Sequence, residues 1–158
     1  MLPCPTVDLR ETPEPGPQQS HPAPRPSEAC GPAAQRLTSV LSTALRSDVP
    51  SFAWNTKRLQ YETVAELPRG GKMQVRIIAG HEYPKRAESQ CPVNADWDCT
   101  WTVTEDKTIV IVTETGKTFQ AEAYRKDGTS MLILATKEIL TRNQLAAVAG
   151  NPGLTLFP

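Results

Sequence analysis

Four short segments rich in Val, Ile, Thr and Phe follow one another between positions 99 and 135, and links of only three to five residues separate them. Strands joined by such short links pair as antiparallel hairpins, and the Asp127-Gly128 dipeptide in the last link is a strong hairpin signal. No proline interrupts the chain between Val93 and Asn151. The sequence is therefore constrained to a fold built on an antiparallel meander, with strands near 99–104, 108–113, 117–124 and 130–135.

Two earlier strands and two helices complete the predicted domain. Residues 58–64 and 72–78 have strand character, which gives a sheet of about six strands. Gly31-Pro32 suits a helix start, and the chain after it carries one apolar stripe before Asp48-Val49-Pro50 ends the helix. Thr141 and the glutamine three residues later form a capping-box pattern for a closing helix. We expect an α+β fold in which the first helix packs on the sheet.

The two continuous apolar runs predict where the sheet is most deeply buried. Ile109–Val112 and Met131–Leu134 lack alternating polar positions. Such runs are typical of strands that are covered on both faces. We therefore expect both to be central strands, with the first helix as one cover.

The amino-terminal segment has a different composition from the rest. Nine of the 15 prolines fall in the first 32 residues, and the run 12–26 has almost no apolar content. Such a segment cannot bury enough surface to offset the entropy of ordering. The sequence predicts a disordered, Pro-rich lead or linker over 1–30 and a single α+β domain over 31–158.

The four cysteines suggest an oxidising compartment. Cys91 and Cys99 flank a polar turn and predict a small disulfide loop, which leaves Cys4 and Cys30 as a possible second pair. Two alternatives are a zinc site and four free thiols in a cytosolic protein. The spacing of eight residues departs from the usual zinc patterns, so no metal site is assigned.

Bulk properties exclude several classes of partner. The 17 basic and 17 acidic side chains cancel, so no long-range field favours a nucleic acid. No apolar stretch reaches the roughly 18 residues that a membrane-spanning helix needs. The first residues also lack the pattern of a signal peptide. If the protein is exported, we expect its targeting segment to be absent from this chain.

No motif for catalysis or for a cofactor stands out, and we expect a non-enzymatic protein without cofactors. His81 is the single histidine of the predicted domain, and no nucleophile signature surrounds any serine or cysteine. A small hydrolase that uses His81 is kept as an alternative. Among the aromatic residues, Trp54, Tyr83 and Trp97 fall in or beside predicted loops, where such side chains can anchor a partner or a sugar ring.

The back half of the chain resembles uncharacterised extracellular domains of exported or membrane-tethered actinobacterial proteins. The resemblance covers about 91–158 and rests on the two cysteines around a short loop, the Asp-Gly turn at 126–129 and the closing helix at 140–154. It implies an extracellular or cell-envelope location and assigns no activity to any residue.

These observations lead to one favoured function and two alternatives. We expect a secreted or cell-envelope interaction module whose partner is an unknown protein or envelope ligand. A secreted protease inhibitor that presents the loop 91–99 is the first alternative, and the hydrolase is the second.

Overall fold

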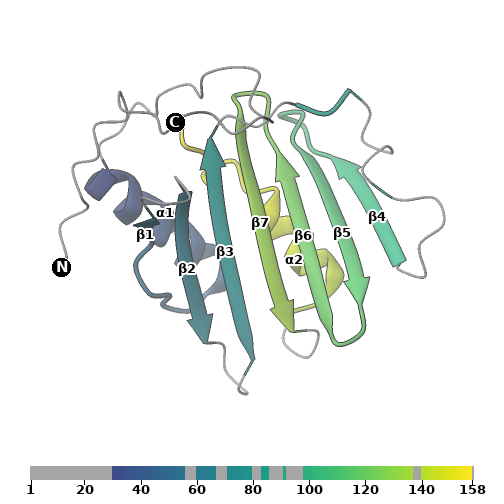
Figure 1. The fold of residues 1–158 in the computed structure, drawn as a ribbon, viewed down its shortest axis with the longest axis horizontal. Helices are drawn as coiled ribbons and strands as arrows, with labels where there is room; N and C mark the ends of the chain where they lie inside the picture. The colour runs from purple at the N-terminus through teal and green to yellow at the C-terminus, as the bar shows by residue number, and fades with distance from the viewer. Residues whose placement is uncertain are drawn as a thin grey trace.

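The protein is described by a computed structural model that covers residues 30–55, 60–66, 71–79, 83–85, 91, 98–136 and 140–157. Its elements form a seven-stranded antiparallel sheet with both helices on one face, behind the sheet in the view of Figure 1. The elements are α1 (Cys30–Leu45), β1 (Ala53–Asn55), β2 (Gln60–Glu66), β3 (Lys72–Ala79), β4 (Asp98–Val103), β5 (Ile109–Thr115), β6 (Thr118–Tyr124), β7 (Thr129–Thr136) and α2 (Arg142–Ala149).

The strands lie in the order β1-β2-β3-β7-β6-β5-β4, and every neighbouring pair is antiparallel. The α+β class and the meander of the back half are confirmed. The sheet has one strand more than the six expected, because the three-residue β1 adds to β2. The last strand of the meander, β7, joins β3, so that β4 lies at the far edge of the sheet (Figure 1).

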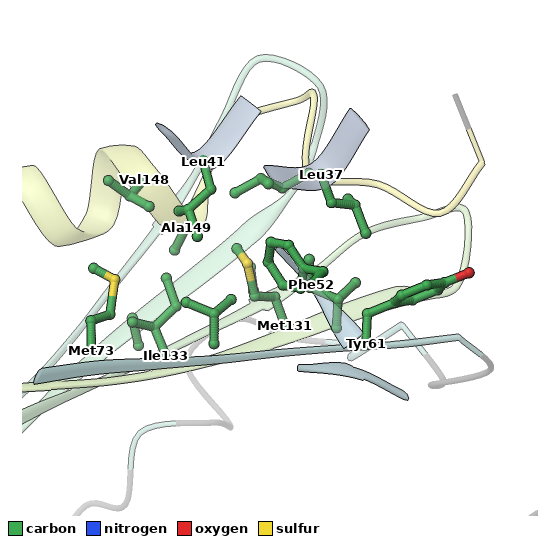
Figure 2. Close-up of a cluster of buried hydrophobic side chains, with 14 of the residues drawn as sticks. Leu37, Leu41, Phe52, Tyr61, Met73, Met131, Ile133, Val148 and Ala149 are labelled. Carbon is green, nitrogen blue, oxygen red and sulfur yellow. The ribbon is translucent and has the colours of Figure 1, made fainter. Parts of the chain in front are cut away.

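The hydrophobic core fills the space between the helices and the sheet. Leu37 and Leu41 of α1 face Met73, Met131 and other side chains that point up from the sheet (Figure 2). These four side chains are at most 3% exposed. Successive strand residues point to opposite faces, so each strand gives its alternate residues to this core. We call the other face of the sheet, which neither helix covers, the open face.

The prediction about the two apolar runs is partly wrong. The run in β7 lies in the middle of the sheet, as expected, whereas the run in β5 lies next to the edge strand. On the open face Leu132 and Leu134 of β7 are only partly buried. The helix that lies against β5, β6 and β7 is α2, and α1 packs beside β1 and α2.

The closing helix begins where its capping box predicts. The amide of Gln144 donates to Oγ1 of Thr141 at 3.1 Å, and the amide of Thr141 donates to Oε1 of Gln144 at 2.9 Å. The carboxy-terminal segment after α2 docks on the domain, because Leu154 and Leu156 are buried.

Two arginines donate hydrogen bonds to the backbone of that segment. Arg36 of α1 donates to the carbonyl oxygen of Gly153 at 2.7 Å and also to that of Thr155. Arg125, which follows β6, donates from Nε to the carbonyl oxygen of Leu154 at 3.2 Å. The segment is thus held from the helix layer and from the end of the sheet. The predicted lead is not tested, because residues 1–29 lie outside the described residues.

Candidate functional site

The register of the sheet defines the rows of side chains on the open face. Cross-strand partners share a face in an antiparallel sheet. One row begins on β4, at the rim of the sheet, and crosses five further strands. Its members are Trp101, Ile111, Glu122, Leu132, Arg76 and Glu62. This row shows that the open face changes in character from one end of the sheet to the other.

In the middle of the sheet the open face is polar. Glu122 of β6 accepts hydrogen bonds from Nε2 of Gln120 at 2.7 Å and from the hydroxyl of Tyr124 at 2.6 Å. Burial, together with the hydrogen bond and the negative charge of Glu122, raises the pKa of the Tyr124 phenol above its usual value. In the register Gln120 and Glu122 lie directly beside the partly buried Leu134 and Leu132 of β7, so polar side chains flank these leucines on the open face.

Toward β4 the open face becomes apolar and is partly covered by Tyr83 and Cys91, two described residues of the connection that follows β3. Ile109 and Ile111 are 3% and 2% exposed, and Tyr83 and Cys91 are among the side chains that pack on them. The hydroxyl of Tyr83 donates to the carbonyl oxygen of Lys107 at 2.6 Å. This hydrogen bond fastens the connection to the turn between β4 and β5.

The predicted disulfide between Cys91 and Cys99 is present, with a Cα–Cα distance of 5.6 Å. It ties the connection to the edge strand itself, because Cys99 is the second residue of β4. The proposed pairing of Cys4 with Cys30 cannot be followed, since Cys4 lies outside the described residues.

Two of the three exposed large hydrophobic side chains among the described residues lie close together on β4. Trp101 and Val103 are 47% and 43% exposed, and among the described residues only Val64 is a comparably exposed large hydrophobic side chain, at 49%. Trp101 lies opposite the buried Ile111 of β5, and Val103 lies opposite Ile109. The two side chains therefore extend the apolar end of the open face to the rim of the sheet.

The backbone of β4 also has an unpaired side. The amide of Thr104, directly after the strand, donates to the carbonyl oxygen of Thr108 at 2.9 Å, so the backbone of Thr104 points toward β5. Because backbone direction alternates along a strand, Thr102 and Thr100 also bond to β5, whereas Val103 and Trp101 point outward. No other described strand pairs with that side. We call the outward-pointing residues Cys99, Trp101 and Val103 the β4 edge.

On the helix side of the sheet, ion pairs of one arginine connect β4 and β5 to α2. Arg142, the first residue of α2, lies 2.8 Å from the carboxylate of Asp98 and 2.9 Å from that of Glu114, and it donates to Oγ1 of Thr100 at 3.1 Å. Single exposed ion pairs stabilise a protein by about 0–1 kcal/mol. A bridge to two strands nevertheless restricts how far β4 can move away from β5, which presents the β4 edge on a defined scaffold.

The aromatic residues singled out in the sequence are not brought together. Trp54 lies in β1 on the helix side and packs against Tyr61, with ring centroids 4.9 Å apart. Tyr83 lies on the open face near β5, close to the other end of the sheet. Trp97 and His81 lie outside the described residues, as do residues 92–97 of the cysteine loop, so the inhibitor and hydrolase hypotheses stay untested predictions.

Sequence reasoning missed the β4 edge and Trp101 as its centre. A signal was present in the alternation of Thr100, Trp101, Thr102 and Val103, in which every second side chain is large and apolar. In a strand with two neighbours, that pattern merely predicts one buried face. It gains functional meaning only once the strand is known to lie at the edge of the sheet.

Comparisons with known proteins give no functional assignment. No family model, curated protein or solved structure matches the chain. Within the described ranges, no three His, Cys, Asp or Glu side chains are grouped so that they could hold a metal ion. None of the helices in those ranges is long and apolar enough to cross a membrane.

Proposed function

We propose that the domain is a non-enzymatic protein-interaction module of a secreted or cell-envelope protein, and that it binds its partner through the β4 edge. The observation that carries this proposal is the exposure of Trp101 and Val103 beside an unpaired strand backbone. Tryptophan is enriched among the residues that dominate binding energy at protein interfaces. Outward-facing amide and carbonyl groups add main-chain hydrogen bonds that an extended segment of a partner can complete.

The chemistry of the surrounding surface supports a protein partner. The β4 edge itself carries no charged side chain, and the whole chain has no net charge. Binding there would rest on apolar contact and on backbone hydrogen bonds rather than on attraction to an anionic polymer. The well-fastened strand suits such recognition, because a rigid surface loses little conformational entropy on binding.

The disulfide supports the proposed location. Disulfides persist in secreted, periplasmic and surface proteins and are rare in reducing compartments. Cys99, the second residue of β4, forms the disulfide with Cys91. The redox conditions of the compartment therefore determine whether a covalent bond is present at the binding surface itself.

Site-specific photo-crosslinking in the cells that produce the protein tests the binding surface. A photoreactive phenylalanine derivative replaces Trp101, and in a matched control it replaces Val64, which is equally exposed on the open face of another strand. The proposal predicts a discrete crosslinked product from position 101 and none from position 64. Absence of any product from position 101 would refute binding at the β4 edge.

The proposed compartment has a separate test. Protein isolated without reductant is alkylated, digested and mapped by mass spectrometry. The proposal predicts a linked pair of peptides that contain Cys91 and Cys99. Alkylation of both thiols in freshly isolated material would refute the oxidising location.

A further inference from the structure

We propose that the partner of the β4 edge is a second copy of this chain, whose β4 pairs antiparallel with the first around a two-fold axis at Trp101. This proposal rests on the β4 edge being the binding surface, and it names the occupant. The result is one continuous sheet that runs through both copies, with the helices of both on the same side.

The backbone of the strand fits this pairing. The outward-pointing residues are Cys99, Trp101 and Val103, and they are spaced evenly about Trp101. Around a two-fold axis there, Trp101 meets Trp101 of the second copy, and Cys99 meets Val103. Residues that face one another with outward backbone groups exchange two hydrogen bonds in an antiparallel pair. Every outward amide and carbonyl of the β4 edge therefore finds a partner in the same register.

The side chains fit the same register. On the open face the two Trp101 rings become neighbours, and Val103 lies beside the disulfide of the other copy. On the helix side Thr100 faces Thr102. Aromatic pairs and threonine pairs are favourable across strands, whereas like charges directly opposite are unfavourable. The one charged residue of β4, Asp98, meets Thr104 rather than another carboxylate.

The two edges of the sheet differ in a way that points to a partner strand for β4. Proteins protect an edge strand with lysine, proline, a bulge or short length, because an unpaired edge tends to add another strand. The edge strand β1 has only three residues. The six-residue β4 contains neither lysine nor proline, and its pairing with β5 runs without a bulge from Asp98 to Val103. Since every copy of the chain presents the same self-complementary strand, a second copy is the occupant that this pattern favours.

The size of the contact sets the expected strength. A single pair of six-residue strands buries less surface than the roughly 800 Å² per partner of a standard stable interface. We therefore expect a reversible dimer with a dissociation constant in the micromolar range. Sedimentation velocity of the purified chain, from low micromolar to near-millimolar concentration, should show a shift from monomer to dimer.

Substitutions at Trp101 test the position of the two-fold axis. Trp101→Lys places two ammonium groups opposite each other in the dimer, and Trp101→Glu places two carboxylates there, so each variant alone should bind itself at least about ten-fold more weakly. An equimolar mixture of the two variants should dimerise again, because lysine then meets glutamate. Val64→Lys puts the same charge on an equally exposed position of β2 and should leave the dimer unchanged.

A proline tests the backbone contribution. The amide of Val103 points outward, so Val103→Pro removes a hydrogen bond to the second copy without removing one to β5. This variant should stay folded by circular dichroism and should be monomeric. If it does not fold, the charge variants at Trp101 still decide the question.

The outcomes separate this inference from the proposed function. A wild-type chain that remains monomeric at every concentration would overturn the dimer, and a crosslink from position 101 to a different protein would do so while retaining the β4 edge as a binding surface. Self-association of Trp101→Lys as strong as that of the wild type, or a mixture that dimerises no more strongly than either variant alone, would overturn the register. Dissociation by Val64→Lys would overturn the location of the interface.

Discussion

Replacing Arg125 with methionine should destabilise the domain strongly, because this arginine holds the end of the sheet and the carboxy-terminal segment together. The guanidinium group is buried, with 6% of the side chain exposed. Its Nη1 donates to Oγ1 of Thr108 at 3.0 Å and lies 3.4 Å from the carboxylate of Asp106. The other nitrogens donate to backbone carbonyl oxygens at the end of α2 and in the segment after it, those of residues 149, 151 and 154.

The magnitude follows from what the substitution leaves behind. Methionine fills much of the volume but donates no hydrogen bond, so the buried carbonyl oxygens lose their partner. Burial desolvates the charged guanidinium group at some cost and lowers the pKa of Arg125. Removing one partner from a buried charged network costs about 3–5 kcal/mol. For a domain of this size that corresponds to a fall of roughly 10–20 °C in the melting temperature.

Urea denaturation followed by tryptophan fluorescence measures the loss. Asp106→Asn is the matched control, because it removes only the exposed end of the network, where the carboxylate side chain is 45% exposed. That control should lose about 1 kcal/mol or less. A loss below about 1 kcal/mol in Arg125→Met would refute the view that this arginine fastens the carboxy-terminal segment.

Three further perturbations have defined outcomes. Replacing Cys91 and Cys99 with serine opens a loop of about nine residues and should cost about 2.5 kcal/mol in urea denaturation, and an unchanged midpoint would show that the bridge does not constrain the unfolded chain. Thr141→Ala removes the cap of α2 and should cost about 1 kcal/mol in the same assay, whereas no loss would contradict the capping box. The raised pKa of Tyr124 makes a stabilising contribution that is complete below pH 10.0, the usual value, and declines as the pH rises above it, because the unfolded chain ionises first. A titration of tyrosinate absorbance in which every tyrosine ionises near its usual pKa would contradict this.

The elements of the fold could be predicted from local patterns. The short links of five, two and four residues determine that β4 to β7 pair in sequence, and positive φ at Gly116 and Gly128 allows two of those turns. The capping box at Thr141 places the start of α2. These features depend on neighbours in the sequence, so a single chain is enough to recognise them.

The order of the strands could not be predicted in the same way. The pairing of β3 with β7 joins residues at least fifty positions apart, and no local pattern specifies it. That pairing decides that β4 lies at the edge and that the apolar run of β5 lies beside it rather than in the middle. The short β1 was missed because three residues carry too little periodicity, and it forms where Trp54 packs against Tyr61.

The candidate site could not be predicted from the sequence for the same reason. Loop position suggested Trp54 and Tyr83 as binding residues, yet one packs on the helix side and the other is fastened to the backbone of Lys107. Trp101 looked like an ordinary strand residue. Its exposure depends on the long-range pairing that places β4 at the rim of the sheet.

Residue-resolved hydrogen exchange of the β4 amides at low and high protein concentration tests the central claim most directly. The amides of Thr100 and Thr102 bond to β5 and should be protected at both concentrations. The outward amides of Trp101 and Val103 should exchange rapidly in dilute protein and become protected as the concentration rises. Rapid exchange of these two amides at every concentration would contradict pairing of β4 with a second copy.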